Sequence, residues 1–280
     1  MKNRKSPIKT SFLRLGCALL LAAAMPVPLS AAPDFTPEEP RLVLDFNSLG
    51  VGAKVTSLPG WSGGNNDDIV GAAPRTPTQN PHSTILTTTN GQNQSVTSPA
   101  QTVTPALPSD ATVYFSAWLN WSGSNSSNVR INLQNSEGIS VGAFGLASKE
   151  FGMADADGNW TYSNLTLTAH QWYELALVVD LQPDDLAASL GYLYYRPVNS
   201  DAFELLPGFE NGILMGYGTD LDATHFAGWS LQLRNEIQLD HLTVGIAAIP
   251  EPGSVALAAG ALLLLFAGRL VSRGSHGRLT

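Results

Sequence analysis

The stretch that decides the fold is Trp172 to Leu181, which reads WYELALVVDL. Apolar residues fill almost every position, and such a near-continuous run is typical of a strand that is buried on both faces. No long segment of the chain keeps apolar residues at helical spacing. The sequence therefore predicts an all-β fold built around this strand.

Shorter apolar or alternating runs, each bounded by Gly, Pro, Asn or Asp, lie on both sides of this strand. Together with it they predict strands at 41–47, 112–121, 129–133, 140–146, 160–167, 172–181, 190–196, 202–206, 229–233 and 237–244. Strands at intervals of about 8–15 residues with turn signals between them indicate one β-sandwich over residues 41–248.

Three stretches are less regular. Residues 32–40 are a leader rich in Pro and Glu. Residues 61–108 are rich in Gly, Asn, Thr, Ser and Pro, and predict two or three short strands with long loops, or surface disorder. Residues 183–188 predict a single helical turn or a hairpin tip.

Two strand motifs carry a resemblance to a known family. Gln171 to Asp180 reads QWYELALVVD, and the closing segment Ile237 to Gly245 reads IQLDHLTVG. With the opening Leu44-Asp45-Phe46-Asn47, this order is similar to that of the concanavalin A-like and laminin-G-like jelly rolls. The resemblance implies a jelly-roll β-sandwich that binds glycans, or a polysaccharide lyase or hydrolase on the same fold.

Catalytic motifs are not found. The glucanase branch of that family uses Glu-x-Asp-x-Glu on one strand, which would point the carboxylates into one groove. The nearest match here is Asp155-Ala156-Asp157, followed by Gly158, and Asp-Gly predicts a hairpin tip. Asp155 and Asp157 as Ca²⁺ ligands are the alternative. No catalytic residue and no other cofactor is predicted, and an enzyme is the less favoured interpretation.

Aromatic side chains are the remaining clue to function. Trp121, Trp160, Tyr192 and Tyr194 are predicted to be partly exposed, and aromatic faces can stack on sugar rings. Trp118 and Trp172 lie inside strong predicted strands and are expected in the core. The four exposed residues are therefore the candidate glycan-binding residues.

The N-terminus predicts export. Residues 1–31 combine basic residues, an apolar run from Leu15 to Met25 and small residues at the end, which is the pattern of a cleaved secretory signal peptide. Cleavage is expected after Ala31 or Ala32, and an uncleaved anchor is the alternative. The single cysteine, Cys17, would leave with the signal, so the mature chain would contain no disulfide.

The C-terminus, residues 249–280, predicts a membrane tail. Pro250-Glu251-Pro252 precedes an apolar helix expected at 254–271, and a basic end at 269–280 contains Arg269 and Arg273. The arginines place this end in the cytoplasm by the positive-inside rule. The arrangement resembles the PEP-CTERM sorting domain of Gram-negative bacteria; an ordinary single-span anchor is the alternative. The resemblance implies recognition by an exosortase and transfer to the cell surface or an exopolysaccharide matrix.

The segment between the two ends is acidic. Residues 33–248 contain 22 acidic and 7 basic residues, which gives a formal charge of −15. Such a surface repels nucleic acid and anionic lipid headgroups. Nucleic acid is therefore not an expected partner. The resemblance of the tail implies an exosortase during sorting, the membrane through the tail before processing, and possible binding to an exopolysaccharide, with a purely structural matrix protein as a further alternative.

Overall fold

The computed structural model describes residues 35–46, 48–49, 51–63, 69–71, 84–86, 94–103, 112–124, 127–135, 138, 140–147, 149–182, 184–216, 226–235 and 237–248. These ranges contain strands, turns and two short 3-10 turns, η1 (Val55–Ser57) and η2 (Leu186–Ala188). The predicted all-β class is confirmed. The helical turn expected at 183–188 corresponds to η2, which lies in the connection between two antiparallel strands.

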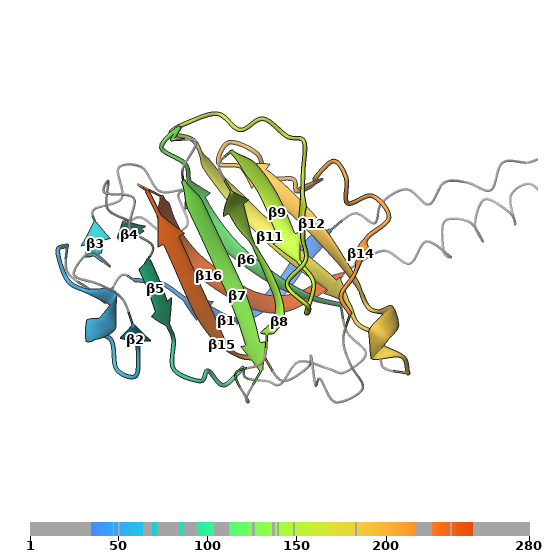
Figure 1. The fold of residues 1–280 in the computed structure, drawn as a ribbon, viewed down its shortest axis with the longest axis horizontal. Helices are drawn as coiled ribbons and strands as arrows, with labels where there is room; N and C mark the ends of the chain where they lie inside the picture. The colour runs from blue at the N-terminus through green and yellow to red at the C-terminus, as the bar shows by residue number, and fades with distance from the viewer. Residues whose placement is uncertain are drawn as a thin grey trace, which may run out of the picture. The chain divides into compact units, whose positions relative to one another are not determined.

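The strands form two antiparallel sheets (Figure 1). Sheet 1 has the order β13 (Glu204–Leu205), β12 (Leu190–Pro197), β11 (Trp172–Asp180), β6 (Thr112–Asn120), β16 (Gln238–Ala248), β4 (Thr84–Leu86) and β3 (Ile69–Gly71), with β1 (Thr36–Leu44) paired to β16 and β14 (Ile213–Leu214) paired to β12. Sheet 2 has the order β10 (Trp160–Tyr162), β9 (Glu150–Ala154), β8 (Ser140–Ala147), β7 (Asn128–Asn135), β15 (Phe226–Arg234), β5 (Gln94–Thr97) and β2 (Ser62–Gly63).

The two sheets pack face to face around one continuous apolar core. Phe115 of β6 in sheet 1 meets Trp229 of β15 in sheet 2 edge to face, with ring centroids 6.4 Å apart. Trp229 is fully buried, and so are Leu175 and Leu177 on the inner face of β11. Because side chains alternate along a strand, the same strands present a second set of residues on the outer faces. The sandwich class is therefore confirmed, and the two outer faces are where a ligand could bind.

Strand β11 occupies the position that its sequence predicts. Trp172 to Val179 are all buried, and only Asp180 is partly exposed. β6 and β12 pair with it on either side over eight or nine residues each. The outer residues of β11 are covered as well as the inner ones, so a continuous apolar run is stable at this position.

Several predictions of the strand pattern need correction. β1 begins at Thr36, inside the stretch predicted to be an irregular leader. It carries Pro37 and Pro40, and its pairing with β16 shifts register at both. Proline is tolerated there because β1 pairs with β16 alone among the described strands, so one side needs no ladder hydrogen bonds. β10 ends at Tyr162 and not at residue 167, and β9 and β14 were missed. β15 begins at Phe226 and not at residue 229, and residues 61–108 contain four described short strands where two or three were expected.

Candidate functional site

The outer face of sheet 2 is polar where its inner face is apolar. β7 alternates between buried Val129, Ile131 and Leu133 and outward residues that are polar without exception. The outward set is Asn128, Arg130, Asn132 and Gln134. β15 continues the pattern, with buried Leu231 and Leu233 alternating with polar outward residues. Sheet 2 is the nearer layer in Figure 1 and presents this face to the viewer.

Cross-strand register places a floor of small residues in the middle of this face. One row runs across five strands as Gln232, Arg130, Gly145, Gly152 and Tyr162. The next row runs as Ser230, Asn132, Ala143, Ala154 and Trp160. The two central strands, β8 and β9, thus contribute only glycine and alanine to both rows. Aromatic side chains of β10 lie on one side of this floor and polar side chains of β7 and β15 on the other.

The aromatic side is a pair of stacked rings. The ring centroids of Trp160 and Tyr162 lie 5.6 Å apart and the ring planes differ by 18°. Tyr162 is 39% exposed, and Trp160 is half-buried. A Cβ atom at Gly152 would lie 2.5 Å from Cδ1 of Tyr162, so glycine is what allows the ring to lie flat on β9. The pair therefore forms a platform with one well-exposed ring.

Arg130 connects this platform to the polar side of the face. Its guanidinium carbon lies 4.6 Å from the centroid of the Trp160 ring, which is a cation–π geometry. β7 and β10 are separated by two strands, so Arg130 and Trp160 meet above the small residues of β8 and β9. Burial raises the pKa of Tyr162, while Arg130 acts to lower it and Glu150 to raise it. Tyr162 is thus neutral near pH 7 and can donate and accept a hydrogen bond.

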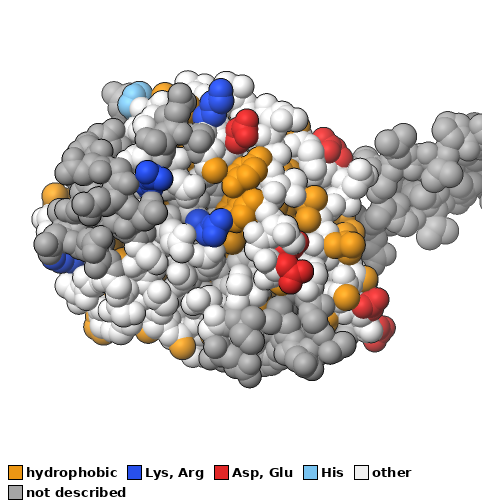
Figure 2. All heavy atoms as spheres, viewed as in Figure 1, with side chains coloured by type: hydrophobic (Ala, Val, Ile, Leu, Met, Phe, Trp, Pro, Cys, Tyr) orange, Lys and Arg blue, Asp and Glu red, His pale blue; other side chains and the backbone are white. Residues whose placement is uncertain are grey.

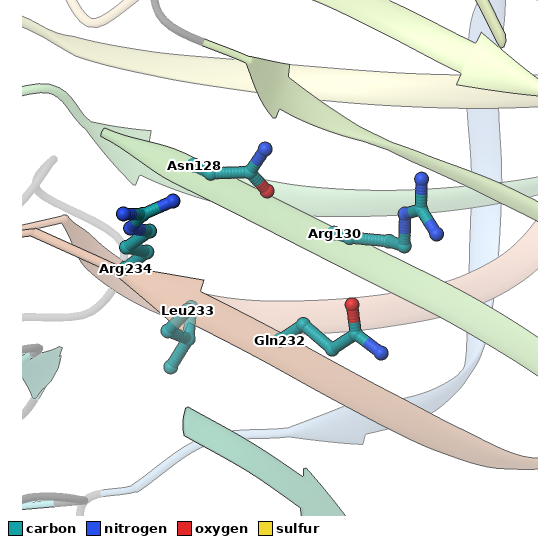
Figure 3. Close-up of a pocket in the computed structure, with 5 residues that line it drawn as sticks. All are labelled: Asn128, Arg130, Gln232, Leu233 and Arg234. Atoms are coloured by element: carbon teal, nitrogen blue, oxygen red, sulfur yellow. The ribbon is translucent and has the colours of Figure 1, made fainter. Parts of the chain in front are cut away.

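A pocket lies beside the platform, between β7 and β15. Its volume is about 220 Å³, and it is lined by Asn128, Arg130, Gln232, Leu233 and Arg234 (Figure 3). Two guanidinium and two amide groups therefore border one opening. Figure 2 shows hydrophobic side chains near the centre of this face, next to Lys or Arg side chains. Aromatic surface, hydrogen-bonding amides and positive charge are thus adjacent on an open face.

The residues predicted to bind glycans do not come together. Trp160 lies on the platform, but Tyr192 and Tyr194 lie on sheet 1. Tyr194 is 2% exposed, because Phe35 packs on it with ring centroids 5.2 Å apart. Trp121 is 8% exposed and belongs to the core, where its indole N–H donates to the Ser124 carbonyl at 2.9 Å. The predicted exposure of Trp121 and Tyr194 is therefore wrong.

Asp155 and Asp157 lie in the turn between β9 and β10, as predicted for a hairpin tip. The Asp155 carboxylate accepts hydrogen bonds from the backbone N–H of Asn159 at 2.8 Å and from its side-chain amide at 2.9 Å. This carboxylate therefore stabilises the turn. In the described ranges no set of three or more His, Cys, Asp or Glu side chains is arranged to hold a metal ion.

The predicted signal peptide and sorting tail lie outside the described residues. This applies to Pro250, Glu251, Pro252, Arg269 and Arg273, and to the helix expected at 254–271. Among the residues that are described, no helix is long and apolar enough to cross a membrane.

The outer face of sheet 1 carries charged residues that are largely shielded from solvent. Arg196 forms an ion pair with Glu174, with Nη2 and Oε2 2.6 Å apart, and the hydroxyl of Ser116 donates to Oε1 of Glu174 at 2.9 Å. Asp240, two strands away from Glu174, is 1% exposed. Burial raises the pKa of Asp240 to about 7. These acids are covered by other groups, so they are not placed as an accessible acid pair for hydrolysis.

Comparison with known proteins shows no family for this chain. No protein-family model and no curated protein matches the sequence. One similar solved structure is the globular domain of T. cruzi calreticulin, at TM-score 0.42 and 11% identity over 85% of this chain and 99% of that one. Another is a carbohydrate esterase from the Shiga toxin-encoding bacteriophage phi24B, at TM-score 0.42 and 10% identity over 74% and 98%.

A third similar structure is an alginate lyase in complex with an alginate trisaccharide, at TM-score 0.40 and 9% identity over 77% of this chain and 99% of that one. TM-scores in this range reflect a loose likeness of strand arrangement. The fold and the site of this chain are therefore defined by its own strand order and side chains.

Proposed function

We propose that the chain is an exported glycan-binding module whose ligand lies on the outer face of sheet 2. The observation that carries this proposal is the Trp160–Tyr162 platform beside the pocket lined by Arg130 and Arg234. Pyranose rings have an apolar face that stacks on aromatic rings, while their hydroxyl groups need amide and guanidinium partners. Both kinds of partner border the same floor of glycine and alanine.

Binding can be tested by affinity electrophoresis of the full-length protein through gels that contain soluble xylan, hydroxyethylcellulose, alginate or polygalacturonate. Retardation by at least one polymer is expected. Replacing Tyr162 with Ala removes the most exposed ring of the platform, and the affinity should fall about 5- to 10-fold, equivalent to roughly 1 kcal/mol or slightly more. Replacing Trp160 with Ala should have a larger effect, because Arg130 loses its partner as well.

A matched control comes from the opposite sheet. Tyr192 is a partly exposed aromatic residue on β12, so Tyr192→Ala removes a similar ring from sheet 1, whereas the platform strand β10 belongs to sheet 2. This variant should bind as the wild type does. If Tyr192→Ala abolished binding while Tyr162→Ala did not, the ligand would lie on sheet 1. If no polymer retarded the wild-type protein, the proposal would be wrong.

The route of export belongs to the same proposal. We infer cleavage of the segment 1–31 and exosortase recognition of Pro250-Glu251-Pro252, which place the module at the cell surface or in an exopolysaccharide matrix. The tail pattern of the sequence supports this inference. Cell fractionation of the producing bacterium tests it. Glu251→Ala should leave the protein in the membrane fraction, and the same surface yield for wild type and variant would contradict the inference.

A further inference from the structure

The pocket between β7 and β15 concentrates positive charge on an acidic chain. Residues 33–248 contain 7 basic against 22 acidic residues, and two of the seven, Arg130 and Arg234, line this one pocket of about 220 Å³. The other described lining residues are Asn128, Gln232 and Leu233, so no acid occurs in the described part of the lining. Two guanidinium groups therefore border one pocket on a chain whose net charge is negative.

The register brings the four polar groups within reach of a single ligand. Arg130 lies directly opposite Gln232, and Asn128 lies directly opposite Arg234. Directly opposed residues on an antiparallel pair have Cβ atoms about 5 Å apart, and diagonal neighbours about 7–8 Å. Figure 3 shows the four side chains on the two neighbouring strands that border the opening. Figure 3 shows the Arg130 and Arg234 guanidinium groups at opposite ends of this set of side chains, so each can contact a separate group of an extended ligand.

The chemistry of these groups favours a carboxylate. A guanidinium presents parallel N–H donors that match the two oxygens of a carboxylate, and charge-assisted hydrogen bonds of this kind are about twice as strong as neutral ones. The amides of Asn128 and Gln232 supply further N–H donors. Neutral glycans offer no group that would use two guanidinium groups in this way.

The platform fixes which way the sugar would face. The Arg130 guanidinium lies 4.6 Å from the Trp160 ring centroid, so the pocket and the platform are continuous. A sugar ring stacked on the platform would place an acidic substituent within reach of the pocket, because Arg130 contacts the platform and also lines the pocket. We propose that the glycan bound by this face is a uronic-acid polysaccharide, whose ring carboxylates are held by Arg130 and Arg234. This inference rests on the proposed function above.

A matched pair of polymers tests the carboxylate. Polygalacturonate and the same polymer after chemical reduction of its carboxyl groups differ in charge but keep the backbone. Binding of the full-length protein to each is measured by affinity electrophoresis in 50 mM and 500 mM NaCl. Polygalacturonate should bind at least about 10-fold more tightly than the reduced polymer, and high salt should weaken its binding, because the Debye length falls from more than 10 Å to about 4 Å.

Charge-removing variants locate the effect. Arg234→Gln keeps an amide in the pocket and removes the charge, so the affinity for polygalacturonate should fall about 5- to 10-fold. Lys54→Gln makes the same charge change at an exposed position that does not line the pocket, and should leave the affinity unchanged.

The outcomes separate the two proposals. Preference for polygalacturonate, with loss in Arg234→Gln and not in Lys54→Gln, supports the inference. Equal binding of both polymers without salt dependence would overturn the inference and leave the proposed function standing. Loss of binding in Lys54→Gln equal to that in Arg234→Gln would mean that general charge, and not this pocket, is responsible. Failure of the wild type to bind any polysaccharide would overturn the proposed function itself.

Discussion

Replacing Asp240 with Asn should remove a pH dependence from the stability of the fold. Asp240 is 1% exposed on β16, and its carboxyl Oδ1 accepts a hydrogen bond from the backbone N–H of His241 at 2.8 Å. Burial raises the pKa of Asp240 from 3.8 to about 7, with Asp45 raising it further and the bond from His241 opposing the rise. In the unfolded chain the same carboxyl ionises near its ordinary pKa.

The direction and size of the change in the free energy of unfolding with pH follow from proton linkage. Between about pH 4 and pH 7 the folded state holds a proton on Asp240 that the unfolded state has lost, so the free energy of unfolding falls as the pH rises through this window. The shift is about 3 pH units, and each unit corresponds to about 1.4 kcal/mol, which gives roughly 4 kcal/mol over the whole window. From pH 5 to pH 8 the loss is about 3 kcal/mol.

Asn keeps an acceptor oxygen for the His241 N–H but cannot ionise. The free energy of unfolding of Asp240→Asn minus that of the wild type should therefore increase by about 3 kcal/mol from pH 5 to pH 8. Burial lowers the pKa of His241, which on its own makes stability fall as the pH drops below the ordinary histidine pKa. His241 is present in both proteins, so this effect cancels in the difference.

Urea unfolding followed by tryptophan fluorescence at pH 5, 6, 7 and 8 measures this difference. Asp185→Asn, at an exposed position near η2, is the matched control and should track the wild type at every pH. A difference between Asp240→Asn and wild type that stays constant from pH 5 to pH 8 would refute the assignment of a buried, protonated Asp240.

Three further predictions concern packing. Gly152→Ala would place a Cβ 2.5 Å from Cδ1 of Tyr162 and 2.7 Å from the backbone oxygen of Thr161, so both the ring and strand β10 must shift. Glycan affinity should fall several-fold and the urea unfolding midpoint should fall as well. Glu174→Gln removes the carboxylate that pairs with the partly buried Arg196 guanidinium and should cost about 1–3 kcal/mol in urea unfolding, with the double variant Glu174→Gln/Arg196→Met recovering part of the loss. Trp229→Ala should lower the free energy of unfolding by about 3–5 kcal/mol. Trp229→Phe should lower it clearly less, because the buried indole N–H has no hydrogen-bond partner among the described residues and so no hydrogen bond is lost. Equal costs for the two variants would contradict this.

The elements with a strong local pattern were predictable from sequence. β6, β11, β12 and β16 each begin within one residue of the predicted position, because their apolar residues keep a pattern that burial on a sheet requires. β9, with the sequence EFGMA, was not predicted, since it has only five residues and, after Glu150, its outward residues are glycine and alanine, so the alternation of apolar with polar residues is weak. Whether this segment forms a strand depends on the side chains that cover its outer face, and these side chains come from β7 and β10.

The site was less predictable than the fold because its parts are far apart in the chain. Trp160 was identified as a candidate, but Arg130, its cation–π partner, lies thirty residues earlier, and only the strand order places the two together. The burial of Tyr194 likewise depends on a residue that is far from it in the chain. Phe35, which covers it, comes from a segment whose sequence gave no sign of ordered structure. Contacts of this kind depend on tertiary register and not on local propensity.

The two outer faces of the sandwich use opposite packing, and this decides which of them is available to a ligand. On sheet 1 large aromatic residues fill the outer face, and Tyr114, Trp118 and Trp172 are at most 5% exposed there. On sheet 2 the two rows that reach Trp160 and Tyr162 carry only glycine and alanine on β8 and β9, which weakens β-propensity and contributes little buried apolar area. A sheet stabilised only by its inner face would have no reason to keep such residues side by side on its outer face. They are explained if the space above them must hold flat aromatic rings and, on those rings, a ligand.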